Sequence, residues 1–301
     1  MIFLEIASCE QGTVLALGNF DGLHIGHMAV INAAKKIAEK KSAKPVALIF
    51  KEHPLEILQG RPPVTLLDNS MRDEILKNMG VEVCDIDFKS LMDMTPEEFF
   101  NRIVIEMMGA VGVTCGFNYT FGRRGEGDAE CLRKLCENKG IEFYMAPEND
   151  YKGEPVSSTR IRNYIAGGKI EEANEMLGRA FNYKQLVVDG DKRGRTFGTP
   201  TINQYLPTNF VEPKHGVYMS KSVVGDKEYY SVTNLGVRPT IGTGLVSSET
   251  YILDFSGDLY GKYVEVKLLK YIRPEIKFNS LEELKNQIKK DAQTVRDLAN
   301  I

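Results

Sequence analysis

The sequence predicts a two-domain chain in which an α/β domain is followed by a mostly β domain. The first half alternates short apolar runs with amphipathic segments of helical period, which is typical of a parallel sheet with helices on both faces. The second half contains many short strand-like runs separated by turns that carry Gly and Pro, which is typical of a barrel or a sandwich. The length of 301 residues fits two domains of ordinary size.

The first half supplies the expected elements of the α/β domain. Residues 13–18 form an apolar run that predicts a strand, and residues 27–40 predict a helix with its apolar side chains on one face. Thr95, Pro96 and Glu98 form a capping pattern that predicts the start of another helix. The other expected strands are residues 45–50, 81–86, 110–115 and 141–146, and the other expected helix is residues 67–79.

The second half changes pattern after Gly178. We place the domain boundary near residues 178 to 184, so that the domains are residues 1–180 and residues 181–301. The expected strands of the second domain are residues 183–188, 217–224, 229–235, 250–255 and 263–271, and the expected terminal helix is residues 281–298.

Composition and charge exclude several classes of protein. A hydrophobic content of 43% and a charged content of 26% argue against a disordered chain. The net charge of -3, with no long basic run, argues against binding to nucleic acid through phosphate contacts. The first twelve residues lack the pattern of a signal peptide, and no apolar run is long enough to cross a bilayer. We therefore expect a cytoplasmic monomer or weak homo-oligomer with no membrane partner.

The cysteines predict no disulfide framework and no zinc site. Their number is odd, no two form C-x-x-C, and no pair of histidines lies nearby at zinc spacing. We expect buried free thiols in a reducing compartment. The cysteines are Cys9, Cys84, Cys115, Cys131 and Cys136.

Residues 18–27, GNFDGLHIGH, lie where the first expected strand turns into the first expected helix. Such a turn offers free backbone N–H groups and the positive end of the helix dipole to an anion, so it is a natural phosphate site. His24 and His27 can donate to phosphate oxygens, and we expect their charge to adjust near neutral pH. The alternative is a glycine-rich turn with two incidental histidines, although the chain has only four. The backbone and side-chain candidates for nucleotide binding are Gly18, Phe20, Asp21 and Gly22.

Two later segments carry further polar groups. Residues 116–122, GFNYTFG, follow an expected strand and include Asn118. Residues 157–162, SSTRIR, place three hydroxyls before an arginine, a pattern that can cap a helix and hold phosphate oxygens. Taken alone, this second segment would more often be a helix cap than a binding site.

These segments resemble the bacterial FAD synthetases. Residues 18–27 resemble the nucleotidylyltransferase signature G-x-F-D-x-x-H-x-G-H, and residues 157–162 resemble the S-S-T-x-I-R element. The resemblance implies a Rossmann-like domain in which an FMN phosphate oxygen attacks the α-phosphorus of ATP and pyrophosphate leaves. No general base is needed, since the phosphate is already a nucleophile.

The resemblance also implies roles for single residues. His24 and His27 would contact the ATP phosphates, and Arg162 would stabilise charge on the leaving pyrophosphate. Magnesium is expected to bridge the phosphates. His53 resembles the P-H-P histidine of the family with Glu52 before it, and both a direct role and a loop position remain open. The other residues expected to bind nucleotide or substrate are Asn118, Ser157, Ser158 and Thr159.

Residues 190–203, GDKRGRTFGTPTIN, are dense in glycine, cations and short polar groups. Such a loop can supply N–H groups to phosphate and oxygens to a cation, and a basic surface loop is the alternative. The stretch resembles the riboflavin kinase signature, with P-T-I-N where P-T-A-N is usual. Similar segments continue through residues 216–218, 234–240, Glu249 and 272–275, so the resemblance covers nearly the whole chain.

The second resemblance implies an antiparallel β-barrel kinase domain with a terminal helix. Thr201 and Asn203 would bind magnesium and ATP phosphates, with Gly190, Arg193 and Gly198 in the phosphate loop. Glu249 would accept the proton of the riboflavin 5′-hydroxyl as it attacks the γ-phosphorus. The residues alone favour a solvated strand-edge carboxylate at that position.

Two departures from the kinase pattern leave three hypotheses. Tyr251 stands where the family has the histidine of E-V-H, and Gln185 replaces a glycine. The first hypothesis is an enzyme that makes FMN from riboflavin and then FAD. The second is an FMN adenylyltransferase whose barrel only binds flavin, and the third is a non-catalytic flavin- or nucleotide-sensing regulator. A pure sensor would not need the histidine pair.

Overall fold

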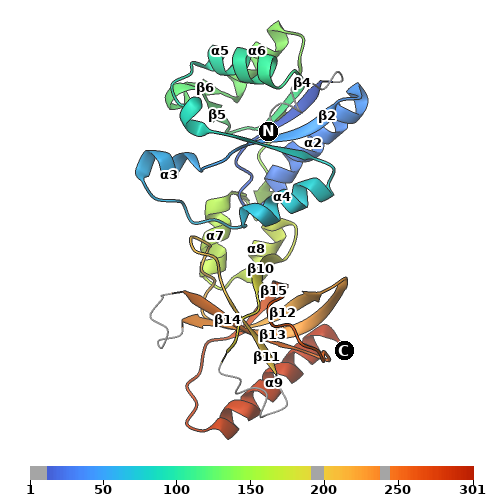
Figure 1. The fold of residues 1–301 in the computed structure, drawn as a ribbon, viewed down its shortest axis with the longest axis vertical. Coiled ribbons are helices and arrows are strands. Elements are labelled where there is room, and N and C mark those ends of the chain that lie inside the picture. The colour runs from blue at the N-terminus through green and yellow to red at the C-terminus, as the bar shows by residue number, and fades with distance from the viewer. Residues whose placement is uncertain (1–11, 191–199, 238–244) are drawn as a thin grey trace. The chain divides into compact units, whose positions relative to one another are not determined.

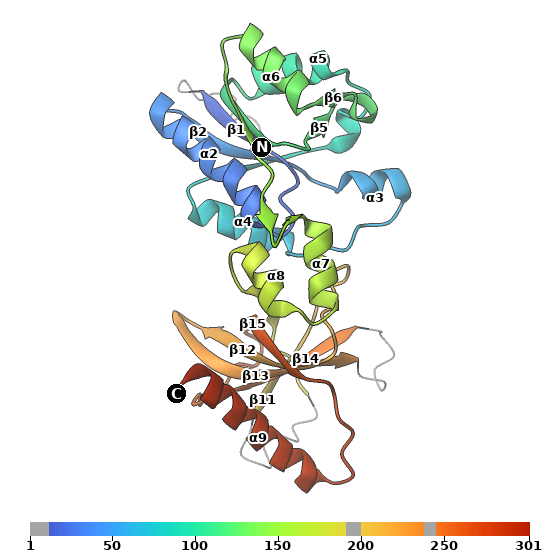
Figure 2. The same ribbon diagram turned by 180° about the vertical axis from the view of Figure 1, so that it is seen from behind.

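The computed structural model describes residues 12–190, 200–237 and 245–301. The chain separates into two compact units, shown from opposite sides in Figures 1 and 2. The first unit comprises the described residues through Thr65 together with Asn69–Ser158, and the second comprises Leu66–Asp68 together with the described residues from Thr159 onward. The domain limits 1–180 and 181–301 stay a prediction.

The first unit is built on a five-stranded parallel sheet, as the sequence predicts. The strand order is β3-β2-β1-β4-β7, and each neighbouring pair is parallel. All five residues of β1 are buried, because helices cover both faces of the sheet. The strands are β1 (Thr13–Leu17), β2 (Lys44–Phe50), β3 (Glu82–Ile86), β4 (Ala110–Gly116) and β7 (Glu142–Ala146).

The helices of the first unit bury one apolar stripe each. Helix α2 (Ile25–Lys41) lies against β1, β2, β4 and β7. The opposite face of the sheet packs on α5 (Pro96–Phe99), the π-helical turn that continues it (Phe100–Met107), and α6 (Ala129–Asn138) (Figure 1). The remaining elements are α3 (Pro54–Gln59), α4 (Asn69–Asn78), the single turns Phe88–Ser90 and Arg123–Gly125, and the short strands β5 (Thr120–Phe121), β6 (Gly127–Asp128), β8 (Asp150–Tyr151) and β9 (Glu154–Pro155).

The predicted cap of α5 is confirmed. The Thr95 hydroxyl accepts from the backbone N–H of Glu98 at 3.2 Å, and the Glu98 carboxylate accepts from the N–H of Thr95 at 2.8 Å. This reciprocal pair satisfies two N–H groups that the first helical turn leaves without partners.

The second unit is built on a six-stranded antiparallel sheet of order β10-β15-β12-β13-β14-β11, which curls as the predicted barrel (Figure 2). The strand predicted at residues 250–255 lies earlier in the chain, because β14 runs from Val246 to Ile252. The strand β11 was not predicted. The elements are α7 (Ser158–Ala166), α8 (Ile170–Leu177), β10 (Phe181–Leu186), β11 (Thr201–Tyr205), β12 (Gly216–Val224), β13 (Lys227–Val237), β14 (Val246–Ile252), β15 (Tyr263–Arg273) and α9 (Leu281–Ala299).

The curled sheet closes between β11 and the end of β10. The backbone N–H of Val188 donates to the carbonyl of Asn203 at 2.8 Å. The side-chain amide of Gln204 donates to the carbonyls of Gln185 and Val264 at 2.7 and 2.8 Å. A side chain therefore supplies the cross-strand bonds where the backbone ladder ends.

The interior of the curled sheet holds a chain of buried hydroxyls, which we call the hydroxyl chain. The Ser220 hydroxyl donates to the carbonyl of Ser231 at 3.1 Å. A hydroxyl has only one proton to donate, so in the 2.7 Å contact between Ser220 and Thr233 the Thr233 hydroxyl is the donor. The same reasoning fixes the donor in each further contact of the chain. The chain ties four strands together. In donor order, its members are Tyr183, Ser248, Thr250, Thr233 and Ser220.

Helix α9 packs on one face of this sheet. Val295 is buried among Val217, Met219, Val232 and Leu253. Arg273 at the end of β15 forms a bidentate pair with Asp291, at 2.9 Å and 2.6 Å. Because Asp291 is only 4% exposed, losing Arg273 would leave a buried carboxylate without its cation.

The described cysteines agree with the prediction of free thiols. Cys84, Cys115 and Cys136 are buried and Cys131 is half-buried, while Cys9 lies outside the described residues. Burial raises the pKa of Cys115 and of Cys136 to about 12, so neither is a thiolate at neutral pH.

Candidate active sites

The N-terminal site lies where the order of the parallel sheet reverses. Strands β1 and β4 are neighbours, with Leu17 opposite Cys115, so the segments that follow them leave the same edge. Ligands of open α/β sheets bind in the crevice at this point. The structure thus brings together the segment at residues 18–27 and the segment at residues 116–122, including the exposed Asn118.

The turn from β1 into α2 has an unusual backbone. Phe20 and Leu23 have positive φ values of 54° and 44°, and Gly22 has a φ of 82°. Only glycine adopts such angles freely, so the two bulky residues are strained. Strain of this kind persists where surrounding contacts fix it, and it concentrates at functional sites.

The two histidines of the turn are brought into direct contact. Their rings stack with centroids 3.7 Å apart and planes at 17°. His24 is the N-cap of α2, and its Nδ1 accepts from the backbone N–H of His27 at 3.3 Å. The tautomer of His24 is therefore fixed with the proton on Nε2.

Both histidines are neutral at neutral pH, against the expectation that their charge adjusts there. Burial lowers the pKa of His24 to about 4, and its backbone hydrogen bonding offsets only part of that effect. Burial, with a smaller contribution from neighbouring His24, holds the pKa of His27 well below its usual value. The sequence could not show this, because desolvation depends on what packs around the rings.

Further polar groups border the same turn. The Ser158 hydroxyl donates to the carbonyl of Asp21 at 3.0 Å, a bond within the first unit. His53 follows β2, and its Nε2 lies 3.5 Å from Nδ2 of Asn19. Asn19 was not among the predicted site residues, although it stands inside the signature.

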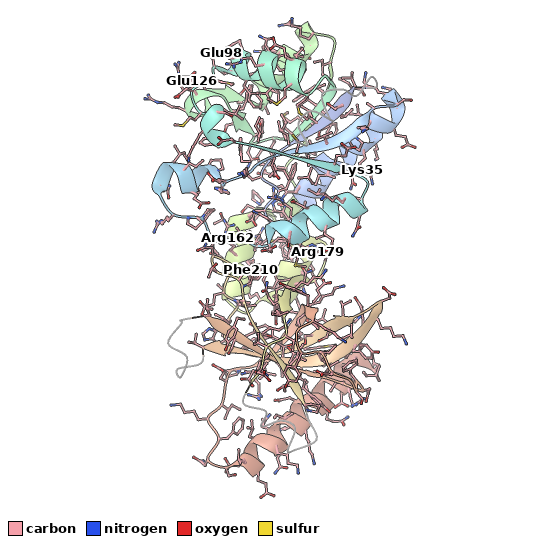
Figure 3. All side chains as sticks on the ribbon, in the orientation of Figure 1. Lys35, Glu98, Glu126, Arg162, Arg179 and Phe210 are labelled. Carbon is pink, nitrogen blue, oxygen red and sulfur yellow. The ribbon has the colours of Figure 1, made fainter. Side chains whose placement is uncertain are left out.

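Arg162 projects from α7 in the second unit (Figure 3). Its Nη2 donates to the Thr159 hydroxyl at 3.0 Å, so the hydroxyl orients the guanidinium along the first turn of the helix. Ser157 is exposed just before α7. The proposed roles of these three residues stay predictions.

The C-terminal site is a row of polar residues across three strands. Asn203 on β11 lies opposite Glu249 on β14, and Glu249 lies opposite Asn234 on β13. Thr201 shares the face of Asn203, because side chains two positions apart on a strand point the same way. The strand register thus brings Thr201, Asn203 and Glu249 together. Arg193 and Gly198 lie outside the described residues.

Glycines lie against both ends of this row. A Cβ on Gly190 would stand 2.2 Å from Nδ2 of Asn203, and one on Gly236 would stand 2.3 Å from Oε1 of Glu275. Glu275 in turn accepts from Nδ2 of Asn234 at 3.4 Å. Gly190 therefore makes room for the Asn203 amide. Asn234 and Glu275 lie beside this row, and the sequence analysis placed them in segments of the kinase resemblance without giving them a role.

The two residues that depart from the kinase pattern, Tyr251 and Gln185, both lie on strands of the curled sheet. Tyr251 lies opposite Thr201 and packs against the apolar cluster under α9. Gln185 lies on β10, where its carbonyl accepts from Gln204. Tyr251 therefore serves the packing of the barrel.

Comparisons with known proteins match the two parts of the chain to two families. The sequence profile of the FAD synthetase family matches residues 6–160, and that of the riboflavin kinase family matches residues 177–299. Among the described helices, none has the length and apolar character needed to span a membrane.

Curated relatives carry both names. The bifunctional riboflavin kinase/FMN adenylyltransferase of Listeria monocytogenes is 35% identical, with 94% of this chain and 91% of that protein covered. The protein of the same name from Bacillus subtilis is 33% identical, over 97% and 94% of the two chains.

A solved structure has the same fold. It is described as a macrolide-efflux protein from Streptococcus pneumoniae and superposes with a TM-score of 0.87 at 33% identity, over 98% of this chain and 96% of that one. With both family profiles matched and relatives similar along nearly their whole length, this chain belongs to the bifunctional riboflavin kinase/FMN adenylyltransferase family.

Proposed function

We propose that this chain phosphorylates riboflavin to FMN with ATP and then adenylylates FMN to FAD with release of pyrophosphate. The observation that carries the proposal is that each unit brings together one pair of the reactive groups, a different pair for each of the two steps. The stacked pair His24 and His27 lies in the first unit, and the facing pair Asn203 and Glu249 lies in the second.

We assign adenylyl transfer to groups of the segments at residues 18–27, 116–122 and 157–162. An oxygen of the FMN phosphate attacks the α-phosphorus of ATP, and the bond from that phosphorus to the bridging oxygen breaks as pyrophosphate leaves. The two histidines donate hydrogen bonds to the ATP phosphates, and Arg162 neutralises charge on the pyrophosphate. The buried position of His24, which is 7% exposed, supports strong electrostatic contacts to a charged ligand. Backbone and side-chain groups that hold the nucleotide and FMN come from Gly18, Asp21, Gly22, Asn118, Ser157, Ser158 and Thr159.

The phosphorylation occurs in the second unit. The 5′-oxygen of riboflavin attacks the γ-phosphorus of ATP, its proton passes to the Glu249 carboxylate, and ADP leaves. The Asn203 amide faces Glu249 across the strand pair and holds a phosphate oxygen or its cation. Gly190 permits the observed position of that amide.

We assign the cation as magnesium. The Thr201 hydroxyl and the Asn203 amide oxygen are hard oxygen ligands beside a carboxylate, which suits a small divalent cation shared with ATP phosphates. Bound magnesium would neutralise charge on the transferred phosphoryl group.

The substrates are the small molecules ATP, riboflavin and FMN, and no nucleic acid takes part. We place the enzyme in the cytoplasm, as a monomer or weak homo-oligomer, with residues 1–180 making FAD and residues 181–301 making FMN.

Chromatography of the flavins formed from riboflavin, ATP and magnesium over time tests the proposal. We expect FMN to rise first and FAD to follow. FAD that forms only when FMN is supplied would support the adenylyltransferase with a flavin-binding barrel. Formation of neither product under these conditions or with added FMN would support the non-catalytic regulator.

A further inference from the structure

The signature turn contains a continuous column of three rings between two glycines, which we call the ring column. A Cβ on Gly18 would lie 3.2 Å from the Phe20 ring, and a Cβ on Gly26 would lie 3.2 Å from the His24 ring. Between these ends, the Phe20 ring meets the His27 ring edge-on, with centroids 5.5 Å apart at 83°, and His27 stacks on His24. Gly18 and Gly26 therefore make room for rings.

Phe20 cannot serve the nucleotide with its side chain. Its residue surface is 0% exposed, and its backbone has the strained φ of 54°. The N–H of Leu23 donates to the carbonyl of Phe20 at 3.2 Å and closes the turn around it. A bulky residue is held in left-handed backbone only where its contacts outweigh the strain, and one of those contacts is the edge-on contact with the His27 ring.

The ring column also decides where the imidazole protons lie. His24 has its proton on Nε2, since its Nδ1 accepts from a backbone N–H. Nδ1 of His27 is buried and has no hydrogen-bond partner among the described residues. A buried N–H without an acceptor is rarer than a buried acceptor without a donor, so the proton of His27 belongs on Nε2 as well. Charging both stacked rings would place two positive charges side by side.

We propose that Phe20 is a positioning residue for adenylyl transfer. Its buried ring holds His27 against His24, so that both imidazoles present an Nε2–H to the nucleotide phosphates. This inference rests on the adenylyl transfer proposed above. Any contact of Phe20 with nucleotide is then left to its backbone, because the ring is buried.

The kinetic test compares Phe20→Leu with Phe100→Leu in the full chain. Leucine is not branched at Cβ, so it fits the left-handed backbone about as well as phenylalanine does, and it removes the ring edge that meets His27. Phe100 is equally buried at 1% exposed but lies in the core on the opposite face of the sheet, so it controls for lost packing.

We expect Phe20→Leu to lower kcat for FAD formation about a hundredfold, because misplacing a catalytic group by about 1 Å has that effect. The KM for FMN and the rate of riboflavin phosphorylation should stay near wild type, and Phe100→Leu should keep its kcat. Should Phe20→Leu fail to fold, Phe20→Met fills the space with a flexible chain and tests the same contact. A kcat for the Phe20 variant within about threefold of the Phe100 variant would overturn the proposal.

The second readout is the ¹⁵N NMR spectrum of the histidine side chains without nucleotide. We expect both His24 and His27 to carry the proton on Nε2 in the wild type and in Phe100→Leu, and a mixture of tautomers at His27 in Phe20→Leu. Tautomers at His27 that are unchanged by Phe20→Leu would refute the positioning role. The spectrum is recorded without turnover, so the two proposals can fail separately. Absence of FAD formation by the wild type would refute the proposed function, whereas the contact of Phe20 with His27 would still be tested by the spectrum.

Discussion

Acidification should destabilise the first unit through the two histidines of its signature turn. The folded state holds His24 neutral with a pKa of about 4, whereas the unfolded chain has the ordinary value of 6.5. Above about pH 6.5 neither state binds this proton, and the stability that neutral His24 contributes is fully present. As the pH falls from about 6.5 toward 4, the unfolded chain binds the proton first, so stability is lost.

The size of the effect follows from the shift. A difference of about 2.5 pKa units, at about 1.36 kcal/mol each, corresponds to roughly 3 kcal/mol when the change is complete. At about pH 5 the unfolded chain is almost fully protonated at this site and the folded chain is not, so roughly 2 kcal/mol is already lost. His24 is 7% exposed, so solvent screening reduces this value little. The lowered pKa of His27 acts in the same direction.

Hydrogen exchange measured by mass spectrometry on the full chain can detect the change. Peptides that cover β1 and α2 should show a lower protection free energy at about pH 5 than at about pH 7, after correction for the intrinsic pH dependence of exchange. His24→Asn is the matched control, because an asparagine oxygen can accept from the N–H of His27 but does not titrate in this range.

We expect the loss of protection in His24→Asn to be smaller by roughly 2 kcal/mol. Equal losses in the wild type and the variant would refute the assignment of His24 as a buried neutral imidazole. An NMR titration that gives His24 a pKa near its ordinary value would refute the same assignment directly.

Four further substitutions test the two sites and the barrel. Glu249→Gln should lower FMN formation by about a hundredfold or more, because the 5′-hydroxyl loses its proton acceptor, and FAD formation from added FMN should be unchanged. His27→Ala should give the reverse pattern, with FAD formation from FMN reduced about a hundredfold or more. Gly190→Ala should reduce only the kinase rate, since the new Cβ would displace the Asn203 amide; an unchanged rate would show that the loop adapts. Thr233→Val interrupts the hydroxyl chain at constant shape and should lower the free energy of unfolding of the second unit by about 1–3 kcal/mol in urea titrations, whereas an unchanged value would mean that its neighbours re-pair.

Local sequence patterns predicted the first unit well. Continuous apolar runs placed β1, β2 and β3, and the period of 3.6 residues placed α2, each within a few residues of the observed ends; the capping pattern at Thr95 marked the start of α5. These features depend on neighbours along the chain, so the sequence contains them. The six-residue helix α3 was not predicted because it buries no residue and leaves no apolar stripe to read.

The barrel was harder to predict for a physical reason. A strand is recognised by apolar side chains that alternate, yet Ser247 and Ser248 of β14 are buried polar residues, and so is Gln204 of β11. Their polar atoms bond to groups on other strands, so their burial is decided by hydrogen bonds between distant parts of the chain. The strand limits at β14 and the existence of β11 were therefore outside the reach of periodicity.

The sequence by itself singled out the candidate residues for the chemistry. The signature at residues 18–27 and the pair Asn203 and Glu249 were found from residue type, spacing and family resemblance. Tertiary structure decided how these residues are used. Packing brings the Phe20 ring against Gly18 and keeps His24 uncharged. Ring contacts and desolvation arise only when the turn folds against the rest of the unit. Strand register places Asn203 beside Glu249 although they are far apart in the chain, and no local pattern encodes that distance.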